Sequence, residues 1–203
     1  MLKSNVSYST DKDSFTAGKV CAEKAVVDLI ETKVAFVFSS VKYNQNKLLE
    51  GAKSVLGTAP IIGCTSSGAI IVPDGVVSSE SGFAGMLAIG DDETAVGVAG
   101  SERDKPDLRN PLIIEDISDI MDKSNFAPFK DTVVRCIKVE NIEKSNSWYK
   151  SMEEYVKGIE DVVGCVPVFG GSAADDSISG DWKIFTNDKC FSDGVAVAFF
   201  YTN

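Results

Sequence analysis

The five residues from Val34 to Phe38 are all apolar, and this run constrains the fold more than any other feature of the sequence. An apolar side chain at every position, rather than at every second one, is typical of a strand that is buried on both faces of its sheet. Such strands occur mainly in sheets that carry other layers of structure on each side. The run therefore predicts a layered α/β domain.

The segments around this run alternate between extended and helical patterns. Residues 5–9 predict a strand, and the polar cluster from Thr10 to Ser14 is rich in helix-capping residues. Apolar residues at helical spacing follow it: Phe15, Ala22, Ala25, Val26, Leu29 and Ile30. A second helical stripe consists of Leu48, Leu49, Ala52, Val55 and Leu56. Gly57 is placed to end this helix, and residues 60–63 predict the next buried strand.

The pattern changes after residue 82. Two strand-like runs, Phe83–Gly90 and Thr94–Gly100, are separated by three acidic residues and predict a hairpin. The polar stretch 101–130, which has one helical pattern, predicts a crossover between two halves of the chain. The elements expected after it are a strand at 132–139, a helix at 147–163, a strand at 167–170 and an antiparallel pair of 181–186 with 193–201 around Asn187 and Asp188.

The chain contains an internal echo. A shift of 107 positions aligns residues 50–63 with residues 157–170 without a gap, and the identical pairs are Gly51/Gly158, Val55/Val162, Gly57/Gly164, Pro60/Pro167 and Gly63/Gly170. A common helix-to-strand connection is the alternative to a true duplication. We expect one domain over residues 1–203, with a mixed sheet and helices packed on it, built from two related halves at about 1–100 and 131–203.

Composition excludes several classes of function. The net charge is −10, and no segment gathers lysine or arginine, so we expect no nucleic-acid partner and no membrane surface. Histidine is absent, which excludes Ser-His-Asp and Cys-His catalysis and histidine-bound zinc or haem. Neither glycine-rich phosphate motif, G-x-G-x-x-G or G-x-x-x-x-G-K-[ST], occurs.

The cysteines and the amino terminus indicate the compartment. Five cysteines form no C-x-x-C pair, and one would be left over from any set of disulfides, so we expect reduced thiols. The first residues lack the apolar run of a signal peptide, and the longest apolar stretches are far shorter than the roughly 18 residues of a membrane span. These features predict a cytoplasmic protein without a membrane-spanning segment.

Small polar segments, 64–68 and 171–176, follow the two echoed strands. The carboxyl ends of strands are where open α/β sheets bind ligands. The sequence therefore predicts a pocket for a small polar molecule at this edge. The candidate binding residues are Cys64, Thr65, Ser66, Ser67, Gly68, Gly170, Gly171, Ser172, Asp175, Asp176 and Tyr43.

Several of these residues have two interpretations. Cys64 is either a reactive thiolate or a small half-buried side chain at a strand end. Asp175 and Asp176 either accept a ligand ammonium group or cap a turn. No calcium-loop spacing surrounds them, and we expect no metal. Lys42 either pairs with an anion or belongs to a surface loop, in which Tyr43 is the better candidate for the pocket wall.

Five segments, in order, resemble the FIST N domain, the sensory input domain of bacterial and archaeal signal-transduction proteins. These segments are 9–15 with 17–19, 60–68, 167–176, 182–185 and 191–195. The resemblance covers nearly the whole chain. It implies a module that binds small molecules, such as amino acids, and passes the signal to a downstream signalling protein or an attached domain. It does not imply catalysis.

The chain departs from the family in two respects. This sequence does not include the FIST C domain that usually follows, so we expect either a stand-alone version or the N-terminal piece of a longer protein. Histidine, which links some relatives to haem and nitric oxide, is absent. We therefore expect no cofactor, although a cysteine remains able to ligate iron. By analogy with other signalling domains, we expect dimerisation with a second copy. Two further hypotheses are an enzyme or redox sensor that uses Cys64, with a carboxylate or lysine transferring the proton, and a pure protein-interaction module.

Overall fold

The computed structural model describes residues 2–91, 94–102, 165, 167–177, 180–187, 189–192 and 194–201. The predicted strand at 132–139, the predicted helix at 147–163 and nearly all of the predicted crossover at 101–130 lie outside these residues. Within the described ranges, no helix is both long and apolar enough to span a membrane.

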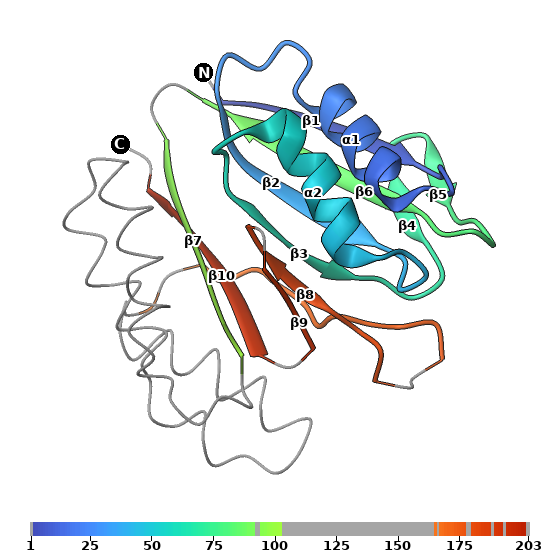
Figure 1. Cartoon of the computed structure of the whole chain (residues 1–203). Coiled ribbons are helices and arrows are strands. Elements are labelled where there is room, and N and C mark those ends of the chain that lie inside the picture. Colours follow the sequence, from blue (N-terminus) through green and yellow to red (C-terminus); the bar gives the residue numbers. More distant parts are fainter. Residues whose placement is uncertain are drawn as a thin grey trace.

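A six-stranded mixed sheet with two helices forms the centre of the fold, which confirms the predicted α/β class (Figure 1). The strand order is β1-β6-β2-β3-β8-β9, in which β2 and β3 are parallel and the other neighbours are antiparallel. Two further pairs, β10-β7 and β4-β5, form separate two-stranded sheets. The elements are β1 (Lys3–Ser9), α1 (Ser14–Ala25), β2 (Thr32–Ser39), α2 (Gln45–Leu56), β3 (Ile61–Thr65), β4 (Ile70–Val72), β5 (Gly75–Val77), β6 (Ala84–Gly90), β7 (Ala95–Glu102), β8 (Ile184–Thr186), β9 (Lys189–Phe191) and β10 (Gly194–Tyr201).

The two helices cover one face of this sheet and contact each other closely (Figure 1). A Cβ atom at Gly18 would lie 2.0 Å from the carbonyl oxygen of Leu48, and one at Gly51 would lie 2.0 Å from the carbonyl oxygen of Phe15. The helices therefore meet backbone to backbone, which only glycine permits at these positions. The core beneath them is alanine-rich and includes Leu48 and Ile61, both fully buried.

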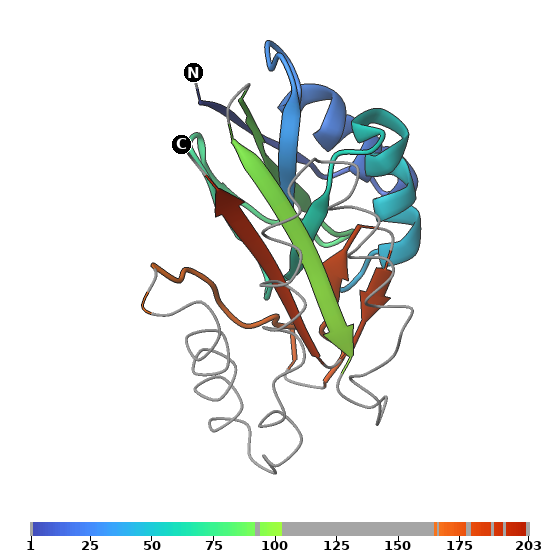
Figure 2. The ribbon, with the colours of Figure 1, turned by 90° about the vertical axis from the view of Figure 1, so that its left-hand side faces the viewer.

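The β7-β10 pair lies across the opposite face of the sheet (Figure 2). Val34 and Ile62 pack there against Val98, and the ring of Phe36 stacks on Phe200 with 6.2 Å between the ring centroids. The apolar run of β2 is thus covered on both faces, as predicted, because alternate residues enter different layers. Phe38, near the end of the run, is still 40% exposed.

The predicted hairpin between residues 83–90 and 94–100 is wrong, although both strands form. β6 lies between β1 and β2, so both of its edges are already occupied. β7 instead pairs with β10 over eight residues, from Ala95 with Tyr201 to Glu102 with Gly194. Pairing along the whole sheet has overridden the local turn pattern.

The final antiparallel pair also differs from the prediction. The turn at Asn187, where φ is +53°, connects β8 to the short strand β9, and β10 leaves to pair with β7. The strand expected at 167–170 is wrong: these residues are irregular and exposed, and no described strand pairs with them. The first helix ends before the last residues of its predicted stripe, and Ile30 is 82% exposed.

Candidate functional site

The chain between β2 and α2 is fixed by one buried side chain, Gln45. Its Oε1 accepts a hydrogen bond from the hydroxyl of Ser39 at 2.7 Å, and its Nε2 donates to the carbonyl oxygens of Ser40 at 2.9 Å and Tyr43 at 3.0 Å. Gln45 is only 7% exposed, and the other end of this network, Ser39, is fully buried. The network holds the first turn of α2 against the carboxyl end of β2.

The amino terminus of α2 has two N–H groups without a partner. The side-chain oxygen of Asn44 accepts a hydrogen bond from the N–H of Lys47, and the backbone carbonyl oxygen of Asn44 accepts one from the N–H of Leu48. For the N–H groups of Gln45 and Asn46, the described part of the chain offers no acceptor. Free N–H groups at the positive end of a helix dipole favour a negatively charged ligand.

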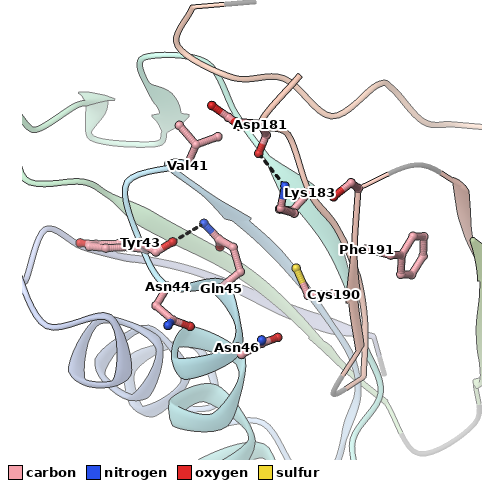
Figure 3. Close-up of a pocket in the computed structure, with 10 residues that line it drawn as sticks. Val41, Tyr43, Asn44, Gln45, Asn46, Asp181, Lys183, Cys190 and Phe191 are labelled. Carbon is pink, nitrogen blue, oxygen red and sulfur yellow. Dashed lines mark hydrogen bonds between the residues drawn. The ribbon is translucent and has the colours of Figure 1, made fainter. Parts of the chain in front are cut away.

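Gln45 and Asn46 border a pocket of about 310 Å³ between α2 and the β8-β9 hairpin (Figure 3). This volume is at the lower end of the roughly 300–1,000 Å³ that is usual for ligand sites. The lining residues come from the start of α2, from the chain before β8, and from β9: Val41, Tyr43, Asn44, Gln45, Asn46, Asp181, Lys183, Cys190, Phe191 and Ser192.

Lys183 brings a positive charge to this pocket. Its Nζ donates to the carbonyl oxygens of Asp181 at 3.2 Å and Trp182 at 3.3 Å, and no carboxylate of the described residues forms an ion pair with it. Its backbone is fixed by β3, since the N–H of Lys183 donates to Oγ1 of Thr65 and the N–H of Thr65 donates to the Lys183 carbonyl, both at 2.9 Å. The ammonium group therefore retains a donor for an anion.

The structure joins the two small polar segments that the sequence singled out. The N–H of Ala174 donates to the carbonyl oxygen of Thr65 at 2.9 Å, and the N–H of Gly68 donates to the Asp176 carboxylate at 2.8 Å. The second oxygen of that carboxylate lies 3.7 Å from Nζ of Lys42. The segments thus meet, and these groups bond to one another.

Asp175 has the geometry of a turn cap. It is 5% exposed, and its carboxylate accepts hydrogen bonds from the N–H groups of Ser177 at 3.0 Å, Gly180 at 2.8 Å and Asp181 at 2.9 Å. These bonds determine where the chain enters the pocket wall. Asp175 therefore positions Asp181 in the described structure.

Cys64 does not have the environment of a nucleophile. Its side chain is half-buried at the end of β3, and this burial raises the pKa of its thiol to about 11. A reactive cysteine needs a lowered pKa, because the thiolate is the attacking species. The geometry instead agrees with a small packed side chain at a strand end.

Of the remaining candidate binding residues from the sequence, only Tyr43 lines the pocket between α2 and the β8-β9 hairpin. The hydroxyl of Ser66 donates to the carbonyl oxygen of Ala69 at 2.9 Å. The exposed members are Ser67, Gly68, Gly170, Gly171 and Ser172.

Tyr43 lines the pocket, but its ring points away from the centre (Figure 3). The ring is 5% exposed and lies beside Gly82, where a Cβ atom would be 2.7 Å from it. Its hydroxyl donates to the carbonyl oxygen of Asp11, and burial raises the pKa of this hydroxyl to about 12. Tyr43 is therefore an anchor of the pocket wall.

The sequence prediction missed most of the pocket. Asn44 carries a detectable signal, because a capping residue between a buried strand and a helical stripe marks a helix amino terminus at a strand end. Lys183 lies in segment 182–185, which carries part of the family resemblance, but no local signal places it beside α2, since it reaches the site through pairing with Thr65, 118 residues away. Among the described residues, no group of three or more cysteine, aspartate or glutamate side chains is arranged to hold a metal ion.

Comparisons with known proteins give one match over most of the chain. The model of the FIST N domain family matches residues 33–203. Two aspartate–tRNA(Asp/Asn) ligases match a short part: 44% identity over 62 residues for that of Anaplasma phagocytophilum and 43% over 60 residues for that of Orientia tsutsugamushi. These matches cover 28% and 27% of this chain, which spans about 10% of the length of each ligase. No solved structure matches.

Proposed function

This chain belongs to the FIST N domain family, a family of signal-transduction sensory domains, and from that premise we propose that it binds a small polar ligand through a carboxylate group. The proposed site is the pocket between α2 and the β8-β9 hairpin. In this proposal, the ligand carboxylate accepts hydrogen bonds from the backbone N–H groups of Gln45 and Asn46 and faces the ammonium group of Lys183. The proposed output is a change passed to a downstream signalling protein or an attached domain, in the cytoplasm.

The observation that carries the proposal is that Gln45, Asn46 and Lys183 line one cavity. Two backbone N–H groups without acceptors and one ammonium group without a carboxylate partner, among the described residues, belong to a pocket of about 310 Å³. An anion that binds there gains hydrogen bonds from charged and dipolar donors. The protein has a net charge of −10, so this local positive region stands out against its surroundings.

An amino acid is the first candidate because the pocket offers groups of both signs. Asp181 lies on the same wall as Lys183, two residues away along the chain. A ligand ammonium group directed toward Asp181 would place the neighbouring carboxylate toward Lys183 and α2. The apolar part of the ligand would then contact Val41.

A thermal-shift screen followed by calorimetry tests this proposal. Amino acids are compared with matched carboxylic acids that lack the amino group and with matched amines that lack the carboxylate. A ligand at about 100 times its Kd adds about 2.7 kcal/mol of stability, which raises the melting temperature measurably. We expect amino acids to stabilise the protein most, the carboxylic acids less and the amines least.

The variant Lys183→Met keeps the length of the side chain and removes its charge. We expect it to weaken the ligand by roughly 10- to 100-fold, because a hydrogen bond to a charged group contributes about 1.5–3 kcal/mol. Ser67→Ala is the control, since Ser67 is exposed and lies outside the pocket lining. Equal affinities of the wild type and Lys183→Met would contradict the proposed site. No stabilisation by any carboxylate would favour a pure protein-interaction module instead.

A further inference from the structure

Two short hairpins of the chain have the same form. β4-β5 and β8-β9 each consist of two antiparallel three-residue strands, joined by two residues, 73–74 in one and 187–188 in the other. Each hairpin also follows one of the two small polar segments. The chain therefore presents the same unit twice, about a hundred residues apart.

A long antiparallel strand pair accompanies each hairpin. β1, which begins the chain, pairs with β6, which follows the first hairpin. β7 pairs in the same antiparallel sense with β10, which follows the second hairpin. The two chain segments 3–90 and 95–201 thus each begin and end with the strands of one such pair. Together with the echo of residues 50–63 in residues 157–170, this order indicates a duplication whose boundary lies near residue 92.

The second hairpin completes the sheet of the first segment. β8 adds antiparallel to β3, with Ile62 opposite Thr186, Gly63 opposite Phe185 and Cys64 opposite Ile184. This addition buries the hairpin, because Phe185 is 0% exposed and Thr186 is 4% exposed. In the duplication, the counterpart of β3 is residues 168–172 and the counterpart of β8 is β4.

Among the described strands, none pairs with residues 168–172, and β4 pairs with β5 alone. Ile71 in the middle of β4 is 86% exposed, and Val76, which lies opposite it in β5, is 69% exposed. Phe169 is 93% exposed. Two apolar segments with free backbone groups are therefore available to each other, and exposed apolar edges of this kind tend to acquire a strand.

We propose that β4 adds antiparallel to residues 169–171 of the same chain, as β8 adds to β3. Transferring the β3-β8 register through the duplication places Phe169 opposite Val72, Gly170 opposite Ile71 and Gly171 opposite Ile70. The conformation described here has this pairing open. Residue 174 is already bonded to Thr65 and Asp176 to Gly68, so closure fixes the segment 171–176 at both ends. The sensory domain thereby has a two-state element that a ligand can bias.

Disulfide trapping tests the register directly. Cys165 is first replaced by serine, because it is a free, exposed cysteine that could form a competing disulfide. Gly171→Cys is then combined with Ile70→Cys, and the protein is oxidised gently with oxidised glutathione. Directly opposed residues of neighbouring strands are close enough for a disulfide. We expect an internal cross-link between positions 70 and 171, identified by mass spectrometry in a protein that remains monomeric on a non-reducing gel.

The matched control joins Gly171→Cys with Val77→Cys. Val77 lies opposite Ile70 in β5 and is thus one strand further away in the proposed sheet, roughly 10 Å from residue 171 and out of reach of a disulfide. If Ile70→Cys fails to fold, as judged by circular dichroism, Phe169→Cys with Val72→Cys tests the same register. Equal cross-linking of the control, no cross-link in either pair, or a covalent dimer would each overturn the proposal.

Discussion

The two faces of the six-stranded sheet are covered in different ways. On one face, α1 and α2 meet through Gly18 and Gly51, and the fully buried core lies beneath them. On the other face, the β7-β10 pair covers Val34 and Ile62 but leaves other apolar side chains of the sheet partly exposed, including Phe38 at 40% and Val6 at 46%.

This difference indicates that the helix face is rigid and that the opposite face opens more easily. A helix pair in backbone contact tolerates no added atom, so it defines one rigid arrangement. A two-stranded ribbon with partly exposed neighbours makes fewer apolar contacts and opens at lower cost. The proposed ligand pocket lies beside the rigid layer, at the start of α2, whereas the proposed movable pairing involves strands outside the six-stranded sheet.

The largest effect on stability is expected for Gly51→Ala. Its Cβ atom would lie 2.0 Å from the carbonyl oxygen of Phe15, so the helices must separate. We expect a loss of at least about 3 kcal/mol in the free energy of unfolding, measured by urea denaturation. Gly170→Ala is the control, because a Cβ atom there meets nothing within 4 Å, and we expect a change within about 0.5 kcal/mol. Similar losses in both variants would refute the rigid helix contact.

A smaller effect is expected on the opposite face. Phe36→Ala removes the ring stacked on Phe200, and we expect a loss of about 2 kcal/mol, below the roughly 3–5 kcal/mol typical of a fully buried phenylalanine. Phe38→Ala, on the same strand and face but 40% exposed, should cost less than about 1 kcal/mol. The same urea experiment measures both. If Phe38→Ala were as costly as Phe36→Ala, the face would be more completely covered than we infer.

The reactivity of one cysteine thiol on each face tests how completely that face is buried. Burial raises the pKa of Cys21, on the helix face, to about 12 and that of Cys64, on the other face, to about 11. Labelling with iodoacetamide at pH 8 should be slow at both, slowest at Cys21, and fast at the exposed Cys165. Peptide mass spectrometry measures each rate. Fast labelling of Cys64 would restore the hypothesis of a reactive thiol.

These raised pKa values also predict the sign of the alkaline response. A thiol that ionises at about 9.0 when unfolded and at 11 or 12 when folded gives stability that is fully present below pH 9. That stability is lost as the pH rises toward 12, and Tyr43, whose pKa is raised from 10.0 to about 12, acts in the same direction. The free energy of unfolding should therefore fall above pH 9. A flat profile up to pH 11 would contradict the burial of these groups.

The smallest effect is expected for the ion pair between Lys42 and Asp176. The atoms are 3.7 Å apart, and the two side chains are 45% and 26% exposed, so water and salt screen the attraction. Lys42→Met should change the free energy of unfolding by less than about 0.5 kcal/mol. It should also leave ligand affinity nearly unchanged, unlike Lys183→Met. A loss comparable to that of Lys183→Met would move the proposed site toward the Gly68 and Asp176 contact.

The sequence predicts best where local pattern and final pairing agree. The capping residues before α1, the apolar stripe of α2 and the apolar run of β2 locate these elements because their signals are local. The same local logic fails at residues 167–170, which resemble β3 but lack a described partner strand. A strand depends on its neighbours, and the neighbours of β3 come from positions near 35 and 185. Lys183 was missed for the same reason.

The most direct test of the proposed site is a ¹⁵N–¹H NMR titration of the protein with an amino acid identified in the thermal-shift screen. The account predicts saturable shifts of the backbone amides of Gln45 and Asn46, because these N–H groups acquire an acceptor when the carboxylate binds. The same shifts should require a roughly 10- to 100-fold higher ligand concentration in Lys183→Met. Saturable binding that leaves both amides unmoved would contradict the site at the start of α2.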